Sequence, residues 1–387
     1  MNEQRQNAFR QQFYNLKLGP VLFDTTAGLT ISYSDNINAS DLSPLEDVII
    51  RPTAQLGFIW PMTEYNTLSV NTVVGYSKYI NHPEFDRPDI SPGSTSDISY
   101  DFSVGAFRFN LHDRFSYSQD PFQYGTGAVA GQADLGRFRN SVGVMGSLPM
   151  RDSVLSFGYD HSNYVLFNDS FQNSDYSSEM VFTRLTYRWN PVLQVGAEAT
   201  GGLTDYEENF RTDNQNYTFG PFFDWKVNSA ITVTARGGLS GYQLSAVGAL
   251  GDVSAPLSYY ASIDVQHTAT KWMTHTLSLG RDTSQGIGES SNFLETMYVR
   301  HSASFRVVRN VGISTQLFYE YSGDSAQGVG LFLRESYSRI GGGITLSYQI
   351  MPKLSSSLSY TRIDKDSSVA RLGYSANSVT LGLNYHF

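Results

Sequence analysis

The last ten residues, Ser378 to Phe387, alternate between apolar and polar side chains with a period of two. One face carries aliphatic and aromatic side chains and ends on Tyr385 and Phe387, whereas the other carries small or hydrogen-bonding side chains. Successive side chains of a β-strand point to opposite sides of a sheet, so this pattern predicts a strand with one apolar and one polar face. Such a strand suits a wall between lipid and water.

The same alternation recurs along the rest of the chain, for example in 21–34, 48–61 and 68–80. Short turns and long polar loops alternate between about eighteen such segments. The sequence therefore predicts an all-β fold: one transmembrane antiparallel up-and-down β-barrel over 20–387, preceded by a periplasmic lead-in over 1–19. An even strand number places both termini on the short-turn side, which we expect to be periplasmic, with the long loops extracellular.

Composition limits the alternatives. No segment approaches the run of about twenty apolar residues that a membrane helix needs, so any membrane interpretation must be a β one. The formal net charge of −9 argues against nucleic acid as a partner. The N-terminus shows no apolar signal core, so we infer that a signal peptide has been removed. A soluble propeller stays open as a rival, but it would have to bury the apolar faces between its blades.

The polar faces of these predicted strands carry many charged residues, which we predict to line the lumen. The basic ones are Arg51, Arg108, Arg114, Arg139, Arg184, Arg188, Arg236, Arg300, Arg306 and Arg339, and the main acidic ones are Glu198, Asp224, Asp264 and Glu320. Arginines outnumber carboxylates on this face, although the whole chain is acidic. They either guide anionic solutes or pair across strands and only stabilise the wall.

The sequence points to no enzyme, cofactor or metal site. The chain has no cysteine, and its seven histidines are scattered. His112 and His386 should face the lumen, yet nothing around either of them indicates a catalytic triad. Two polar residues, Asp113 and His301, fall on the predicted lipid-facing side, which implies either a β-bulge or contact with a partner subunit.

The opening of the chain carries a recognisable set of short motifs. Leu18, Gly19 and Pro20 precede the first strand, that strand leads to Asp35 and Asn36, and Pro52 follows the entry to the second strand. In these features the chain resembles the β-barrel porin 2 family. The resemblance implies an outer-membrane barrel of Gram-negative bacteria that exports exopolysaccharide together with a periplasmic polysaccharide-export protein.

The alternative is a general diffusion porin for small anionic solutes. Such a porin narrows its channel with an inward-folded loop, and the best candidates are Asn81 to Asp97 and Gln119 to Gly136, which are rich in Gly or Pro. The wall residues fit both functions. The resemblance favours export.

Overall fold

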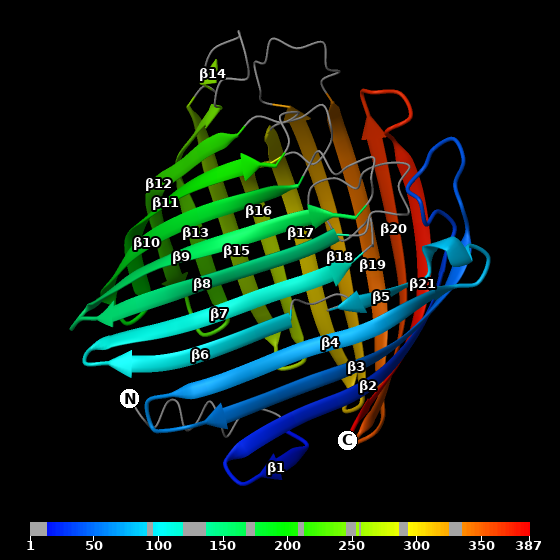
Figure 1. Ribbon diagram of the computed structural model, residues 1–387, viewed down its shortest axis with the longest axis horizontal. Helices are drawn as coiled ribbons and strands as arrows, with labels where there is room; N and C mark the ends of the chain where they lie inside the picture. The colour runs from blue at the N-terminus through cyan, green and yellow to red at the C-terminus, as the bar shows by residue number, and fades with distance from the viewer. Residues whose placement is uncertain are drawn as a thin grey trace.

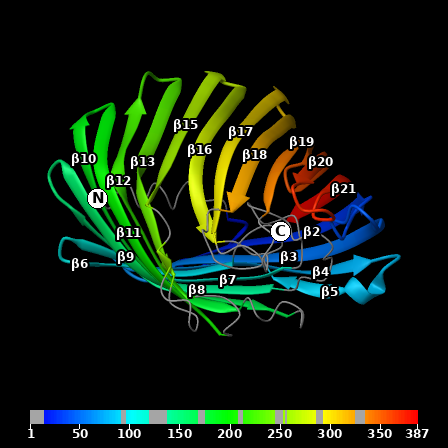
Figure 2. The ribbon, with the colours of Figure 1, turned by 90° about the horizontal axis from the view of Figure 1, so that it is seen from above.

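The computed structural model describes residues 14–90, 96–118, 137–167, 175–207, 213–244, 253–254, 257–285, 293–324 and 335–387. Nearly all of them form one antiparallel sheet that closes on itself (Figure 1). Seen from above, the strands encircle a central space (Figure 2). No helix in the described part of the chain is long and apolar enough to cross a membrane.

Of the 21 strands, β1, β5 and β14 are short and the other eighteen build the barrel. The long strands are β2 (Val21–Ser34), β3 (Asp47–Pro61), β4 (Thr67–Tyr79), β6 (Ser96–Val104), β7 (Phe107–Ser118), β8 (Arg137–Pro149), β9 (Ser153–Leu166), β10 (Tyr176–Asn190), β11 (Leu193–Tyr206), β12 (Asn214–Lys226), β13 (Ile231–Leu244), β15 (Ser258–Thr270), β16 (Met273–Gln285), β17 (Phe293–Val308), β18 (Val311–Asp324), β19 (Ser336–Met351), β20 (Leu354–Ser367) and β21 (Tyr374–His386).

Each long strand pairs with the next one along the chain, and β21 pairs with β2 to close the ring. The register at this closure runs from Thr26 opposite His386 to Ser34 opposite Ser378. The predicted barrel of about eighteen strands is therefore confirmed, and the propeller is excluded. Closure leaves no unpaired edge between the first and last long strands.

Two regions differ from the sequence-based prediction. Leu16–Leu18 (β1), which we assigned to the lead-in, form a short strand paired with β2. Arg87–Ile90 (β5), which we expected within a loop, pair with β4, and Ile90 also pairs with Tyr117 of β7. Because β6 pairs with β4 only over Thr67–Asn71, β5 and β6 together occupy one strand position.

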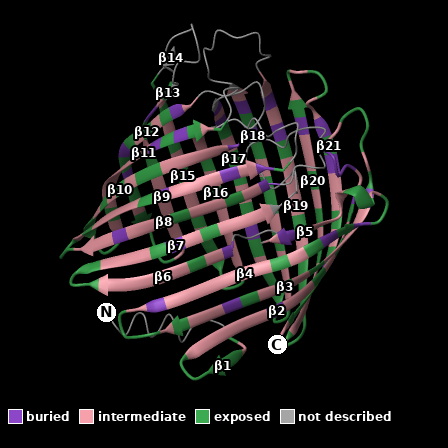
Figure 3. Ribbon diagram, viewed as in Figure 1, coloured by how far each residue is buried: buried purple, intermediate pink, exposed green. Residues whose placement is uncertain are grey.

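The two faces of the sheet differ as the alternation predicted. One face exposes large apolar side chains such as Leu29, Ile31 and Leu381, whereas the most buried side chains include polar ones such as Thr296 and Glu320. Burial changes at short intervals along the strands (Figure 3). The hydroxyl of Tyr260 on β15 lies 3.4 Å from Glu198 Oε1 on β11, although two strands stand between them. Only the concave side of a curved sheet allows such a contact, so the polar face is the interior.

The ends of the barrel also differ. At one end, hereafter the short-turn end, consecutive strands are joined by a few residues, as between Asn190 of β10 and Leu193 of β11. At the other, hereafter the loop end, the connections are longer, as between Ser34 of β2 and Asp47 of β3.

Candidate functional site in the barrel interior

The pairing register places all fourteen predicted charged residues on the interior face. Arg184 stands opposite Glu198, Arg339 opposite Glu320, and Asp264 opposite Thr234. The others share this face through their own paired neighbours: Arg51, Arg108, Arg114, Arg139, Arg188, Asp224, Arg236, Arg300 and Arg306. Whether they govern passage of a solute is a separate, functional question.

Three of the arginines lie at the short-turn end. Arg108 is the second residue of β7, and Arg188 and Arg306 each lie two residues before the end of β10 and β17. Arg188 and Arg306 are exposed. Among the described residues, none of the three has a carboxylate within ion-pair distance, and the exposed Arg188 and Arg306 present their charges to the interior.

Halfway up the wall, arginines and carboxylates surround a cavity of about 410 Å³. Arg236 and Arg281 are its basic lining residues, and Glu198, Asp264 and Asp282 contribute carboxylates. Three phenols, from Tyr242, Tyr260 and Tyr298, complete this part of the lining. Within the described residues Arg236 forms no ion pair, whereas Arg184 beside the cavity lies 3.9 Å from Glu198 and 3.6 Å from Asp224.

Glu320 binds two arginines at once. Its Oε1 lies 2.8 Å from Arg300 Nη2, and its Oε2 lies 2.5 Å from Arg339 Nη2. The side chains of Glu320 and Arg339 are only 3% and 5% exposed, whereas that of Arg300 is 46% exposed. The triad carries a net positive charge, and Arg300 is the member that presents this charge to the interior.

Further ion pairs join the wall nearer the loop end. Arg51 Nε lies 3.3 Å from Asp89, Arg114 Nε lies 3.2 Å from Asp97, and Lys365 Nζ lies 2.7 Å from Glu335. The sequence analysis missed Asp89, Asp97, Asp282 and Lys365. Asp89 and Asp97 fell in an expected loop, and Lys365 was assigned to a loop because β20 continues to Ser367, further than predicted.

His112 does face the interior, and its environment speaks for a structural role. Its Nε2 lies 2.6 Å from Asp160 Oδ1 and its Nδ1 lies 3.2 Å from Asn110 Oδ1. Both ring nitrogens therefore have partners. No serine hydroxyl in the described part of the chain is hydrogen-bonded to this ring, as a catalytic triad would require.

The first long connection, residues 35–46, folds over the interior face. Ala39 is fully buried against Ile363, Tyr374 and Ala376, and the register places these three on the interior side of β20 and β21. Ala39 has a left-handed φ of 50°, a strained conformation for a residue with a Cβ. The structure therefore holds this loop over the interior face at the loop end of the barrel, hereafter the mouth. The left-handed conformation of Ala39 costs backbone energy.

The Asp35–Asn36 pair fixes that loop to the closing strand. Asn36 Nδ2 donates to the carbonyl oxygens of Ser40 and Ser375, each at 2.8 Å. The backbone N–H of Asn377 donates to Asp35 Oδ1 at 2.7 Å. Loop 35–46 thus packs on the interior face, although it was not one of the predicted inward loops. Of those candidates, Gln119 to Gly136 lies outside the described residues, as do residues 91–95 of Asn81 to Asp97, and Arg87–Ile90 of the latter join the wall as β5.

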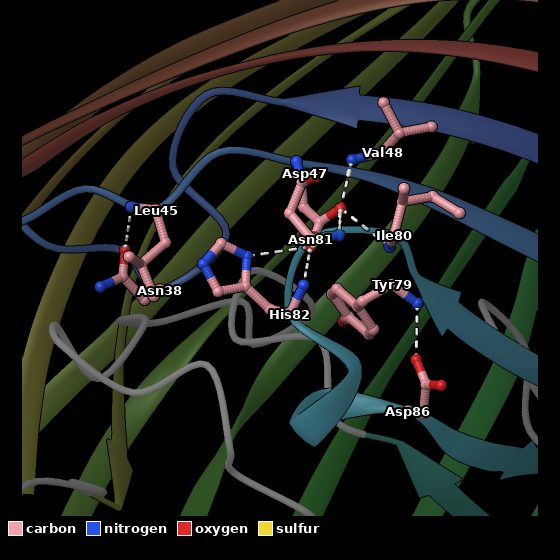
Figure 4. A network of polar contacts seen from close by, with 9 residues as sticks. All are labelled: Asn38, Leu45, Asp47, Val48, Tyr79, Ile80, Asn81, His82 and Asp86. Atoms are coloured by element: carbon pink, nitrogen blue, oxygen red, sulfur yellow. Dashed lines mark hydrogen bonds and ion pairs between the residues drawn. The ribbon is translucent and has the colours of Figure 1, made fainter.

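Asp47 joins this loop to the next one (Figure 4). Its buried carboxylate accepts backbone N–H bonds from Val48, Ile80, Asn81 and His82 and lies 3.0 Å from His82 Nδ1. Just beyond, Asp86 accepts a hydrogen bond from the backbone N–H of Tyr79 at 2.7 Å, and a hydrogen bond from the Lys78 ammonium lowers the pKa of Asp86. The short 3-10 helix η1 (Pro83–Phe85) is held between them.

The two polar residues predicted to face lipid, Asp113 and His301, each have polar neighbours on the outer face. Asn140 Nδ2 donates to Asp113 Oδ1 at 2.6 Å, and the register confirms that Asp113 shares its face with Ile98 and Val142. The ring of His301 lies 5.7 Å from that of His275, which in turn lies 2.9 Å, nitrogen to nitrogen, from His267. No register shift separates Asp113 from its neighbours, so a β-bulge does not explain its position.

Comparisons with known proteins support the fold and little else. No family model matches the chain, and no curated protein matches it. The resemblance to the β-barrel porin 2 family, and its association with exopolysaccharide export, therefore finds no support there.

Several solved structures are similar in shape. Pseudomonas aeruginosa OccK2 in complex with glucuronate has a TM-score of 0.54 and 10% identity, covering 94% of this chain and 98% of its own. Acinetobacter baumannii OccAB3 has a TM-score of 0.54 and 11% identity, covering 96% and 100%. Pseudomonas aeruginosa OpdK with vanillate has a TM-score of 0.51 and 11% identity, covering 94% and 99%. Likeness at such identities establishes the eighteen-strand barrel and no function.

Proposed function

We propose that the chain is an outer-membrane diffusion channel for small anionic solutes, and not an enzyme. The observation that carries this proposal is the distribution of arginines over the interior face. They occur at the short-turn end (Arg188, Arg306), halfway up the wall (Arg236, Arg300) and near the loop end (Arg51). A charged wall of one sign raises the local concentration of ions of the other sign.

Pairing on the wall does not cancel this effect. Arg236 and Arg306 have no ion-pair partner among the described residues, and Arg300 keeps nearly half of its side-chain surface exposed while it holds Glu320. The cavity around Arg236 also contains carboxylates, so the attraction is strongest where Arg300 and the short-turn arginines face the interior.

The barrel surface fits this location. An outward belt of exposed apolar and aromatic side chains, such as Leu279, Val299 and Tyr319, suits a bilayer, and we place the short turns on the periplasmic side. The similar structures include one named as an outer membrane protein and others solved with glucuronate or vanillate. Both of these small molecules carry a carboxylate group, which favours the small-solute alternative.

Polysaccharide export, the function that the resemblance favoured, is therefore replaced by the alternative. The loop 35–46 packs on Ile363 and Tyr374 and so covers part of the interior face at the loop end. Such a cover suits selection of small solutes better than passage of a long polymer. A periplasmic export partner has no support in the comparisons.

Deletion of the gene in its host separates the two functions. We expect slower uptake of small carboxylates and unchanged surface polysaccharide, with uptake restored by the wild-type gene. Normal uptake together with loss of surface polysaccharide would overturn the proposal in favour of export.

A further inference from the structure

A second cavity, of about 420 Å³, lies at the short-turn end beside β16 to β20. Three basic residues line it: Lys271 in the β15–β16 turn, Arg306 on β17, and Arg309 in the β17–β18 turn. No carboxylate belongs to its lining within the described residues. The lining of the cavity halfway up the wall, by contrast, combines Arg236 and Arg281 with three acidic residues, Glu198, Asp264 and Asp282.

Hydrogen-bonding groups surround the three cations. Ser304 stands opposite Thr274, and Gly312 stands opposite both Arg306 and Ser347, so these residues share the interior face. The Ser347 hydroxyl occupies the space beside Gly312, since an added Cβ at Gly312 would lie 2.7 Å from Ser347 Oγ, and this hydroxyl donates to the Gly312 carbonyl oxygen at 3.2 Å. Ser355 and Asn310 add further polar groups to the lining.

Three like charges around one cavity repel one another, and this repulsion opposes the folded state. Elsewhere on the wall the chain relieves such repulsion with a carboxylate, as Glu320 does between Arg300 and Arg339. At the short-turn cavity, no lining side chain in the described part of the chain supplies that charge. A ligand with several negative charges would supply it, and arginine and hydroxyl donors are suited to phosphate or carboxylate oxygens.

We propose that this cavity is a binding site for small oxyanions that carry two or more negative charges, at the short-turn end of the channel. The proposal rests on the proposed function and extends it, because it distinguishes multivalent from monovalent anions. Monovalent anions interact with single arginines along the wall, whereas a multivalent oxyanion engages Lys271, Arg306 and Arg309 together.

Calorimetric titration of the refolded barrel with inorganic pyrophosphate, in a detergent without net charge, tests this site. We expect one binding event per barrel, and a dissociation constant about tenfold weaker in Arg306→Gln, because a charged hydrogen-bond donor is lost. Lys271→Gln and Arg309→Gln, which change turn residues, should weaken binding similarly. The triple variant that combines these two substitutions with Arg306→Gln should abolish binding. Heat-modifiable migration on a gel verifies that each variant folds.

Arg151→Gln is the matched control, because Arg151 lies in the β8–β9 turn at the same end of the barrel, is exposed, and does not line this cavity. It should bind pyrophosphate within about twofold of the wild-type constant, since only long-range attraction changes. Equal affinity in the wild-type and triple variants, or no binding by the wild type, would overturn the inference. A barrel that prefers chloride but binds no pyrophosphate refutes this site alone, whereas a cation-selective barrel refutes the proposed function.

Discussion

Arg339 and Glu320 form an ion pair that is almost wholly enclosed in the interior wall, with side chains 5% and 3% exposed. Arg339 donates from both Nε and Nη2 to the same carboxylate oxygen, at 3.1 and 2.5 Å. The other oxygen accepts from Arg300, which is far more exposed. One carboxylate thus holds a buried arginine on one side and a half-exposed arginine on the other.

Substitutions in the two ion pairs of Glu320, with Arg339 and with Arg300, should have different outcomes. Glu320→Gln removes the carboxylate charge that the buried Arg339 shares with Arg300, which should lower the free energy of unfolding by about 3 kcal/mol. Arg300→Gln should change it by less than about 1 kcal/mol, because Arg300 is half exposed, while reducing anion preference. Urea unfolding in lipid vesicles measures the first effect, and equal stability of Glu320→Gln and wild type would contradict it.

The Asp47 carboxylate should control the width of the mouth. Asp47→Asn replaces one of the two carboxylate oxygens with an amide donor, which faces the backbone N–H of Ile80 if it replaces Oδ1 or that of His82 if it replaces Oδ2. We therefore expect a loss of about 2 kcal/mol in the anchoring of both loops. The result should be faster proteolysis within residues 80–86 and a larger single-channel conductance.

Glu46→Gln is the matched control for that experiment. Glu46 is the neighbouring acid, but it only accepts a hydrogen bond from the Tyr33 hydroxyl at an exposed position. It should leave both proteolysis and conductance unchanged. Identical behaviour of the two variants would show that Asp47 does not hold the mouth.

The outward pair of Asp113 and Asn140 should behave as a unit. Asn140→Leu alone leaves the Asp113 carboxylate without its donor on an apolar surface, at a cost of about 1–3 kcal/mol. The double variant with Asp113→Leu and Asn140→Leu should return close to wild-type stability. Unfolding midpoints in lipid vesicles give the coupling between the two changes, and strictly additive changes would argue against the pair.

Structural features that depend on residues close together in the sequence could be predicted, whereas those that depend on distant residues could not. Alternation is a local property, so strand number and the interior position of residues such as Arg236 and Arg306 followed from it. Asp89 was missed because β5 lies in a Pro-rich segment without visible alternation, and its pairing with β4 is set by a distant strand.

The inward loop could not be predicted for a related reason. Ala39 is buried by Tyr374 and Ala376, more than 300 positions away along the chain, and no pattern within 35–46 announces that contact. The Asp35–Asn36 pair was visible in the sequence, but its bonds to Ser375 and Asn377 arise only when β21 closes on β2.

The central claim, that the interior favours anions although the chain is acidic overall, is tested most directly by the reversal potential of single channels in a potassium chloride gradient. We predict that the reversal potential is displaced from zero toward the equilibrium potential of chloride. In the double variant with Arg236→Gln and Arg300→Gln, this displacement should be smaller. Displacement toward the equilibrium potential of potassium in the wild-type channel would contradict the account. The acidic loops, and not the arginine-bearing wall, would then determine which ion the channel prefers.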